Sequence, residues 1–327
     1  MAFLLSFIRS QFFVKLPYPE LDLTGQTLIV TGANTGLGLE TARHFVRLNA
    51  KKVILGVRSV EKGGEACKSI EQSTGRAHVV EVWALDLSSY ESVMSFAAKV
   101  QGLPRLDAVV ENAGISVDKY QVLEDNESTI TVNVVSTFLL ALLMLPKLRE
   151  SASRFNFVPR LTIVTSDMHQ VASFPERHSE NIFDAINNPA APDMSGRYPL
   201  SKLLEIYIVR ELGPRANDSP KKPPVAINTA NPGFCYSDLM RDAEGLKGMF
   251  LWGLKALTAR STEAGSRNFV FASQLGMESN GRYFTDCAIE EPSKSVRTED
   301  GKQTQAKVWA EISQKLEAIR PGILQNV

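Results

Sequence analysis

A glycine-rich segment near the N-terminus has the composition of a phosphate-binding turn. Residues 31–38 read Thr-Gly-Ala-Asn-Thr-Gly-Leu-Gly and follow a short apolar run. Glycines let the backbone turn tightly and approach a diphosphate, and a helix that begins there offers free N–H groups. The spacing is not Gly-x-Gly-x-x-Gly, and such turns also contain glycines for steric reasons alone. The position between a strand and an amphipathic helix favours a dinucleotide site. Its candidate contacts are Gly32, Asn34, Thr35, Gly36, Leu37 and Gly38.

Residues after the next two apolar runs bear on which dinucleotide would bind. Enzymes that use NAD hold an Asp or Glu at the end of the second strand. Here Arg58 occupies that region and the first acidic residue is Glu61. A guanidinium pairs bidentately with phosphate, so Arg58 favours NADP, although it could also simply solvate a loop. Asp86, followed by Leu87, is placed to hydrogen-bond the adenine, but an acid that caps a helix would look the same.

Four polar residues further along the chain are candidates for the chemical step. Tyr198 and Lys202 lie four residues apart, on the same face of a predicted helix. Ser166 ends an apolar run, and Asn133 lies in the segment after the fourth run. A Tyr-x-x-x-Lys pair alone is common by chance. Its position after a strand that ends in Ser, within a dinucleotide-binding pattern, favours a functional role.

The elements that must position these residues are short strands that alternate with helices. Six apolar runs rich in β-branched residues predict buried strands: 27–32, 52–57, 78–85, 106–112, 161–166 and 225–231. A seventh is expected at Arg282–Phe284, and Ser88 with Glu91 predicts a capping box. Such alternation implies right-handed crossovers and a parallel sheet. We therefore predict one α/β, doubly wound Rossmann-type domain over residues 18–327, with a seven-stranded parallel sheet and helices on both faces.

Composition excludes several other classes of protein. The chain has 327 residues, of which 44% are hydrophobic, and 36 Lys+Arg balance 36 Asp+Glu. These values exclude a disordered, collagenous or disulfide-rich chain and give no electrostatic reason to expect nucleic acid. Cys67, Cys235 and Cys287 are far apart and lack metal-ligand spacing, as do the histidines. We expect no metal, and free thiols in a reducing compartment such as the cytoplasm.

Two apolar segments require a test for membrane contact. Residues 1–17 form an N-terminal extension whose uncharged stretch before Arg9 is too short to span a bilayer. It could pack on the protein's own surface, or residues 1–16 could contact a membrane surface as a peripheral hook. The inserted side of such a hook would be Phe3, Leu4, Phe7, Ile8, Phe12 and Phe13. Ser128–Pro146 is uncharged but contains several polar residues, so a buried helix is expected there.

Taken together, these motifs resemble the classical short-chain dehydrogenase/reductase family. The matching motifs, in order, are TGANTGLG, the ENAG of Glu111–Gly114, Asn133, Ser166, Tyr198 with Lys202, and the NPG of Asn231–Gly233. Within the family the chain is most similar to the retinol-dehydrogenase-like branch, through residues 31–42 and 56–66 and Gly281–Cys287. The resemblance extends from about residue 23 to residue 316.

The resemblance implies a role for each matching residue. Tyr198 would be the general acid/base, and Lys202 would lower its pKa and bind the nicotinamide ribose. Ser166 would hydrogen-bond the reacting oxygen, and Asn133 would hold a water molecule. The remaining implied cofactor contacts are Asn112, Ala113, Gly114, Pro232, Gly233 and Ser237, with Ser237 in place of the Thr that the family often has.

Two loops of the chain are expected to shape the substrate site, and the first of them is longer than is usual in the family. Between Ser166 and Tyr198 lie 31 residues, more than is usual in the family. This substrate loop, 167–197, is expected to form one wall of the substrate cleft, unless it is a harmless insertion. The second loop, 234–262, is rich in Leu, Met and aromatic residues, which suits a bulky hydrophobic substrate. Its residues could instead pack on the sheet or form an interface, such as that of a homodimer.

The leading hypothesis is therefore an NADP-dependent oxidoreductase that interconverts a carbonyl and an alcohol. Its small-molecule substrate would be a secondary metabolite or a retinoid- or steroid-like compound. The alternative is a non-catalytic scaffold or regulator of the same fold that still binds the cofactor.

Overall fold

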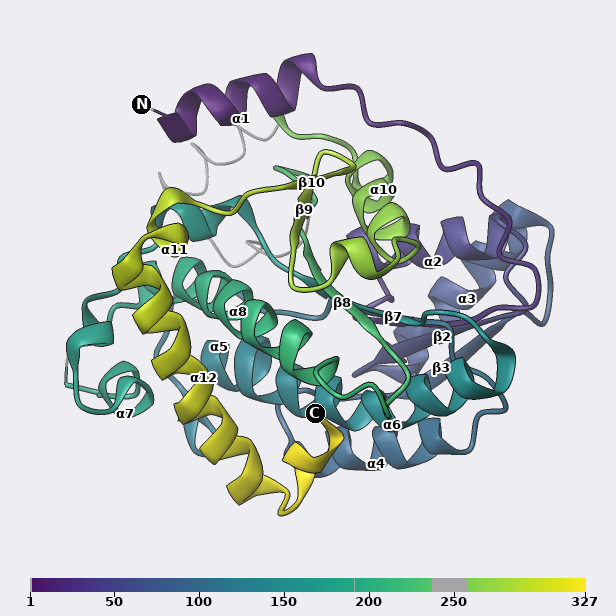
Figure 1. Cartoon of the computed structure of the whole chain (residues 1–327). Coiled ribbons are helices and arrows are strands. Elements are labelled where there is room, and N and C mark those ends of the chain that lie inside the picture. The colour runs from purple at the N-terminus through teal and green to yellow at the C-terminus, as the bar shows by residue number, and fades with distance from the viewer. Residues whose placement is uncertain (1, 191, 237–257) are drawn as a thin grey trace.

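The computed structural model describes residues 2–190, 192–236 and 258–327, and its centre is one large sheet (Figure 1). The strand order is β10-β9-β8-β7-β4-β1-β2-β3, and neighbouring strands are parallel except β10 against β9. The strands are β1 (Thr27–Thr31), β2 (Lys52–Val57), β3 (Val80–Ala84), β4 (Ala108–Glu111), β7 (Arg160–Val164), β8 (Ala226–Ala230), β9 (Tyr283–Thr285) and β10 (Ala288–Glu290). The predicted strands are confirmed to within two residues at each end.

The sheet has eight strands in the described residues, so the prediction of seven was wrong by one. The additional strand, β10, pairs with β9 through a two-residue turn. Asp286 and Cys287 form this turn with φ values of 52° and 58°. Hairpin turns of this kind usually contain Asn-Gly or Asp-Gly, because both residues need a positive φ. An Asp-Cys pair does not carry that signal, which is why the sequence did not reveal the hairpin.

Helices cover both faces of the sheet, as predicted (Figure 1). One apolar core contains side chains of α4, α6, α8 and α12, and the other contains side chains of α2, α3 and α10. The bounds are α2 (Gly36–Arg47), α3 (Val60–Thr74), α4 (Tyr90–Gln101), α6 (Thr137–Phe155), α8 (Met194–Ala216), α10 (Thr262–Ala272) and α12 (Glu299–Ile319). The capping prediction for α4 was displaced by one residue. Ser89, not Ser88, accepts the N–H of Ser92, while Ser88 donates to Asp86.

The uncharged segment after residue 127 is a core helix, as predicted. It runs through α5 (Ser128–Ile130), a π-helical turn η1 (Thr131–Ser136) and α6. The continuous helix Ser128–Phe155 is long and apolar enough to cross a membrane by length and composition, but 94% of its most apolar window is buried in the protein. Its hydrophobicity is therefore accounted for by packing against the sheet.

The segment between Ser166 and α8 is more anchored than its polar sequence suggests. It contains the 3₁₀ turns η2 (Asp167–Val171) and η3 (Pro175–His178) and the short helix α7 (Ile182–Ile186). Four apolar side chains from it are buried in the core: Phe174, Ile182, Phe183 and Ile186. Glu311 of α12 accepts the backbone N–H of Ile182 at 2.8 Å, so α7 is fixed to α12.

The N-terminal helix α1 (Ala2–Phe13) lies near the β9–β10 hairpin, at one edge of the sheet (Figure 1). Ser10 donates to the Asp286 carboxylate at 2.8 Å. Gln11 donates to the carbonyls of Phe234 and Thr258 at 2.7 and 2.9 Å. One side of α1 therefore packs on the protein, which is one of the two outcomes that the sequence left open. The structure also contains the short elements β5 (Val122–Leu123), β6 (Asn126–Glu127) and α11 (Lys294–Arg297).

Candidate active site

The sheet brings the predicted site residues to one edge. In an open parallel sheet, ligands bind beyond the carboxyl ends of the strands where the strand order reverses. That reversal lies between β1 and β4, which are neighbours here although β2 and β3 separate them in sequence. The glycine-rich turn follows β1 and the ENAG segment overlaps the end of β4, so both meet at this point.

The glycines of the turn are in close contact with the end of β4. Gly32 has a φ of 65°, and a Cβ there would lie 2.9 Å from the Cα of Ala113. A Cβ on Gly38 would lie 2.5 Å from Nδ2 of Asn112 and 2.6 Å from the carbonyl oxygen of Gly32. Asn112 in turn donates to the carbonyl of Thr31 at 2.9 Å. Only glycine fits at these places, and the turn leaves the first N–H groups of α2 without a side-chain cap.

Arg58 and Asp86 lie at the same edge with different surroundings. Arg58 directly follows β2 and is exposed; it has no hydrogen bond or ion pair with any other described residue, so its guanidinium is available to a ligand. Asp86 accepts the N–H and the hydroxyl of Ser88 at 2.9 and 2.7 Å. Its carboxylate therefore caps the turn before α4. Both of these bonds go to Oδ1, so an adenine contact would use Oδ2. Leu87 is buried beside it.

Asn133 sits in the π-helical turn η1 and is fully buried. Its side chain bonds both backbone groups of Ile115, accepting the N–H and donating to the carbonyl, each at 2.9 Å. It also donates to the Ser201 hydroxyl at 3.0 Å. A single π turn widens a helix locally and often occurs at functional sites. Here it carries Asn133 toward Gly114, whose added Cβ would lie 3.2 Å from the Asn133 Oδ1.

Tyr198, Lys202 and Ser166 lie together, at the start of α8 and just after β7. The Lys202 Nζ lies 5.6 Å from the centre of the Tyr198 ring and donates to the carbonyl of Val164 at 2.9 Å. Burial raises the pKa of Tyr198, whereas the Lys202 charge and a hydrogen bond from Ser166 lower it. A phenol, an ammonium group and a hydroxyl group therefore lie close together at this place.

Two buried carboxyl groups adjoin this cluster, and the sequence reasoning assigned neither of them a role. Glu205 accepts a hydrogen bond from Lys202 at 2.7 Å, and both side chains are almost fully buried. Glu111, at the end of β4, is also buried. Charged residues are almost never fully buried without a partner. The signal was present in the sequence, as a Glu within an otherwise apolar strand and as a Glu in i, i+3 spacing from Lys202.

The segment after β8 begins at the same edge. Pro232 is buried, and Gly233 has a φ of 76°. Asn231, which precedes them, accepts the N–H of Asp167 at 3.1 Å and that of Gly233 at 3.2 Å. It thereby joins the end of β8 to the residue after Ser166. Ser237 and residues 238–257, which hold most of the predicted hydrophobic wall, lie outside the described residues.

His169 is buried beneath the site, where it holds the backbone of Ser166, and it does not line the surface of the site. Its side chain is 1% exposed, and burial lowers its pKa. Nε2 accepts the N–H of Ser293 at 3.1 Å, so Nδ1 carries the proton and donates to the carbonyl of Ser166 at 2.7 Å. The neutral imidazole ties the Ser166 backbone to the segment before α11. Within the described residues no group of three or more His, Cys, Asp or Glu could hold a metal ion.

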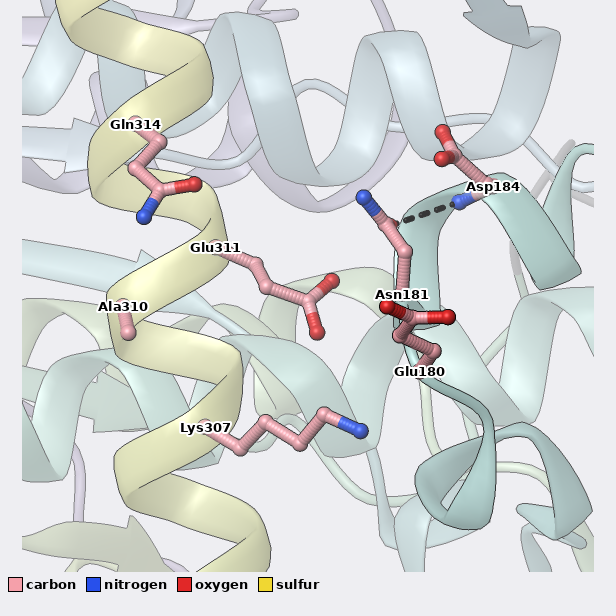
Figure 2. Close-up of a pocket in the computed structure, with 7 residues that line it drawn as sticks. All are labelled: Glu180, Asn181, Asp184, Lys307, Ala310, Glu311 and Gln314. Atoms are coloured by element: carbon pink, nitrogen blue, oxygen red, sulfur yellow. Dashed lines mark hydrogen bonds between the residues drawn. The ribbon is translucent and has the colours of Figure 1, made fainter.

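A separate polar groove lies between α7 and α12 (Figure 2). It has a volume of about 540 Å³. Glu180, Asn181 and Asp184 line one side, and Lys307 and Glu311 face them from α12 (Figure 2). None of its lining residues is a predicted site residue. Since the Glu311 carboxylate holds the start of α7, the groove marks where the insertion packs on α12.

Comparison with known proteins agrees with this architecture. The family model described as short chain dehydrogenase matches residues 26–154. The chain is 46% identical over 329 residues to the short chain dehydrogenase/reductase dmxR8 of Cryptosporiopsis sp., covering 98% of this chain and 100% of that protein. It is also 46% identical over 288 residues to the short chain dehydrogenase atnD of Emericella nidulans, covering 87% and 91% of the two chains.

Solved structures show the same fold at lower identity. An Escherichia coli protein described as a short chain dehydrogenase, solved with NADPH, is 22% identical with a TM-score of 0.58, covering 82% of this chain and 99% of that one. An uncharacterized protein from Mycobacterium paratuberculosis has a TM-score of 0.68 at 24% identity, covering 91% and 95%. With relatives this similar over nearly its whole length, the chain belongs to the short-chain dehydrogenase/reductase family of oxidoreductases.

Proposed function

We propose that this protein is an NADP(H)-dependent oxidoreductase that interconverts a carbonyl and an alcohol on a bulky hydrophobic small molecule. The observation that carries the proposal is the meeting of Tyr198, Lys202, Ser166 and Asn133 beside the glycine-rich turn. The turn suits a dinucleotide: Gly32 and Gly38 pack it closely against the end of β4, whereas a Cβ on Gly36 would meet nothing within 4 Å, so the backbone there is open to a diphosphate. The bound nicotinamide would supply the hydride.

The residues of the chain then have to move one proton and hold the reacting carbon. Tyr198 would give its phenolic proton to the carbonyl oxygen during reduction, or accept the proton of the alcohol during oxidation. Lys202 would favour the tyrosinate through its charge, and Ser166 would donate to the same substrate oxygen. Asn133 would hold the backbone at Ile115, next to Gly114, through its two hydrogen bonds to that residue.

Exposed Arg58 supports NADP over NAD, because an unpaired guanidinium beside the β2 end suits the ribose 2′-phosphate. The Escherichia coli neighbour solved with NADPH is consistent with this preference. The apolar sequence of the loop after Gly233 supports a hydrophobic substrate, such as a secondary metabolite or a retinoid- or steroid-like compound. Placement within the retinol-dehydrogenase-like branch and a homodimer remain predictions from the sequence.

The test is turnover of hydrophobic ketones and aldehydes with NADPH by wild type and by Tyr198→Phe. Because the phenol contacts the substrate and not mainly the cofactor, we expect Tyr198→Phe to lose turnover while NADPH affinity stays nearly the same. Full activity of the variant would refute the mechanism. If wild type binds NADPH but reduces none of a broad set of carbonyls, the scaffold alternative gains support.

We also propose that α1 contacts a membrane surface from a cytoplasmic location. Leu4, Leu5, Ile8 and Phe12 are all exposed and fall within about 100° of the helix circumference. No acidic residue precedes Glu20, whereas Arg9 and Lys15 are exposed beside this stripe. An apolar stripe flanked by cations suits an anionic lipid surface.

The side of α1 expected to insert needs correction. Phe7 was predicted to insert, but its ring centre lies 6.0 Å from that of Phe234, and the Phe3 ring lies 6.3 Å from that of Phe7 at an angle of 38°. Sedimentation with vesicles of phosphatidylcholine and phosphatidylserine tests the proposal on the full chain. We expect wild type and Ser6→Asp to bind, and Leu5→Asp to bind several-fold less. Equal binding of all three, or none by wild type, would contradict it.

A further inference from the structure

A buried carboxylate is attached to the lysine of the candidate site. Glu205 lies one turn after Lys202 on α8, and its Oε1 accepts a hydrogen bond from Nζ at 2.7 Å. The side chains are 2% and 6% exposed, so solvent screens this pair little. Nζ also donates to the carbonyl of Val164 at 2.9 Å. Two of its three N–H groups are therefore directed by the protein, and one is left for a ligand.

The charge of Glu205 acts on Tyr198 in the direction opposite to Lys202. Burial raises the pKa of Tyr198, the Lys202 ammonium lowers it, and the Glu205 carboxylate raises it. The ammonium lies 5.6 Å from the centre of the ring, and its effect on the pKa of the phenol is larger than that of Glu205. Glu205 thus reduces the effect of Lys202 while it fixes the position of Nζ.

A second carboxyl group lies behind Glu205. Glu111 at the end of β4 is 3% exposed, and neither of its oxygens accepts a hydrogen bond from a residue that the structure describes. A buried carboxylate without donors is unfavourable, and the group takes up a proton instead. Burial and the nearby Glu205 raise the pKa of Glu111 well above its usual value. Both effects favour the protonated form of Glu111, whereas Glu205 is the carboxyl group that accepts the hydrogen bond of Lys202.

We propose that Glu205 is a positioning residue for proton transfer at Tyr198: it holds the Lys202 ammonium in place and offsets part of its charge, with Glu111 as a neutral acid behind it. The titratable groups that face Glu205 are Lys202 and Tyr198 from α8 and Glu111 from β4. Burial raises the pKa of Glu205 to about 7, against the opposing influence of Lys202. This inference rests on the proposed role of Tyr198.

The test follows the ionisation of the Tyr198 phenol directly, without any substrate. Tyrosine labelled with carbon-13 at Cζ reports each phenol by NMR, and the signal lost in Tyr198→Phe identifies the residue. Glu205→Gln keeps the shape and an oxygen acceptor for Nζ but removes the charge. We expect the Tyr198 titration midpoint to fall by about one pH unit in this variant. Glu205→Asp retains the charge and should return the midpoint toward the wild-type value.

A matched control lies on the same helix. Glu211 of α8 pairs with Arg215 at 2.8 Å, two turns from the site, so Glu211→Gln should leave the Tyr198 midpoint unchanged. A midpoint in Glu205→Gln equal to or above that of wild type would overturn the proposal, since a merely structural carboxylate would alter thermal stability alone. Failure of the proposed function would look different: the midpoints would shift as expected, but wild type would reduce no carbonyl.

Discussion

Adding one methyl group at Gly38 should damage the dinucleotide site, and the structure gives the size of the effect. Gly38 lies in the first turn of α2, where Gly→Ala by itself would favour the helix by up to about 1 kcal/mol. The new Cβ, however, would meet the Asn112 amide at 2.5 Å and the Gly32 carbonyl oxygen at 2.6 Å. Overpacking of this kind costs about 1–3 kcal/mol, so the contact outweighs the propensity. We expect Gly38→Ala to unfold at lower denaturant concentration than wild type.

The same variant should bind NADPH at least tenfold more weakly, because the displaced Gly32 carbonyl and Asn112 belong to the cradle itself. Denaturant titration gives the stability, and quenching of tryptophan fluorescence by NADPH gives the affinity. Gly64→Ala is the matched control: Gly64 lies within α3, and a Cβ there meets nothing within 4 Å. It should be neutral or stabilising. Equal stability and NADPH affinity in the two variants would refute the steric reasoning.

Two further predictions concern charge. Arg58→Asp should weaken NADPH binding roughly tenfold or more and raise preference for NADH, whereas Lys68→Asp on exposed α3 should leave the ratio of the two affinities unchanged. An unaltered ratio in Arg58→Asp would remove this arginine from the site. Burial lowers the pKa of His44 from 6.5 to about 4, so the unfolded chain takes up a proton first as pH falls. The unfolding free energy should therefore drop between pH 6.5 and 4, by about 3 kcal/mol, and level off below. Denaturant titrations across pH should show a flatter slope for His44→Gln; an identical slope would contradict the assignment.

Much of the fold could be predicted because its determinants are local. Buried parallel strands such as Lys52–Val57 contain apolar runs rich in β-branched residues, and turns such as residues 31–38 are marked by their glycines. The β9–β10 hairpin was not predicted, because Asp286 and Cys287 adopt a positive φ without the usual glycine. In the insertion, Phe174 was hidden among polar residues although it is buried in the core.

The candidate site was predictable where residues match a family pattern and not where they depend on tertiary contact. Nothing local in the sequence shows that Asn133 lies in a π turn, or that its side chain bonds the backbone of Ile115, 18 residues away. The pairing of Glu205 with Lys202 follows from helical spacing. The proximity of Glu111 requires β4 to lie beside β7, which is a property of the assembled sheet.

The docking of α1 also has a consequence for how the chain is made. Ser10 contacts Asp286, which lies 276 residues later in the sequence, so this contact has a very large sequence separation. At about 5–20 residues per second, α1 would be synthesised roughly 14–55 s before its partner. During synthesis both sides of this apolar helix therefore lack their partners, so its apolar surface is most exposed at that stage. Once the C-terminal strands have been made, they cover one side of α1 and leave the other side exposed to solvent. The finished protein therefore exposes only part of the apolar surface that α1 exposes during synthesis.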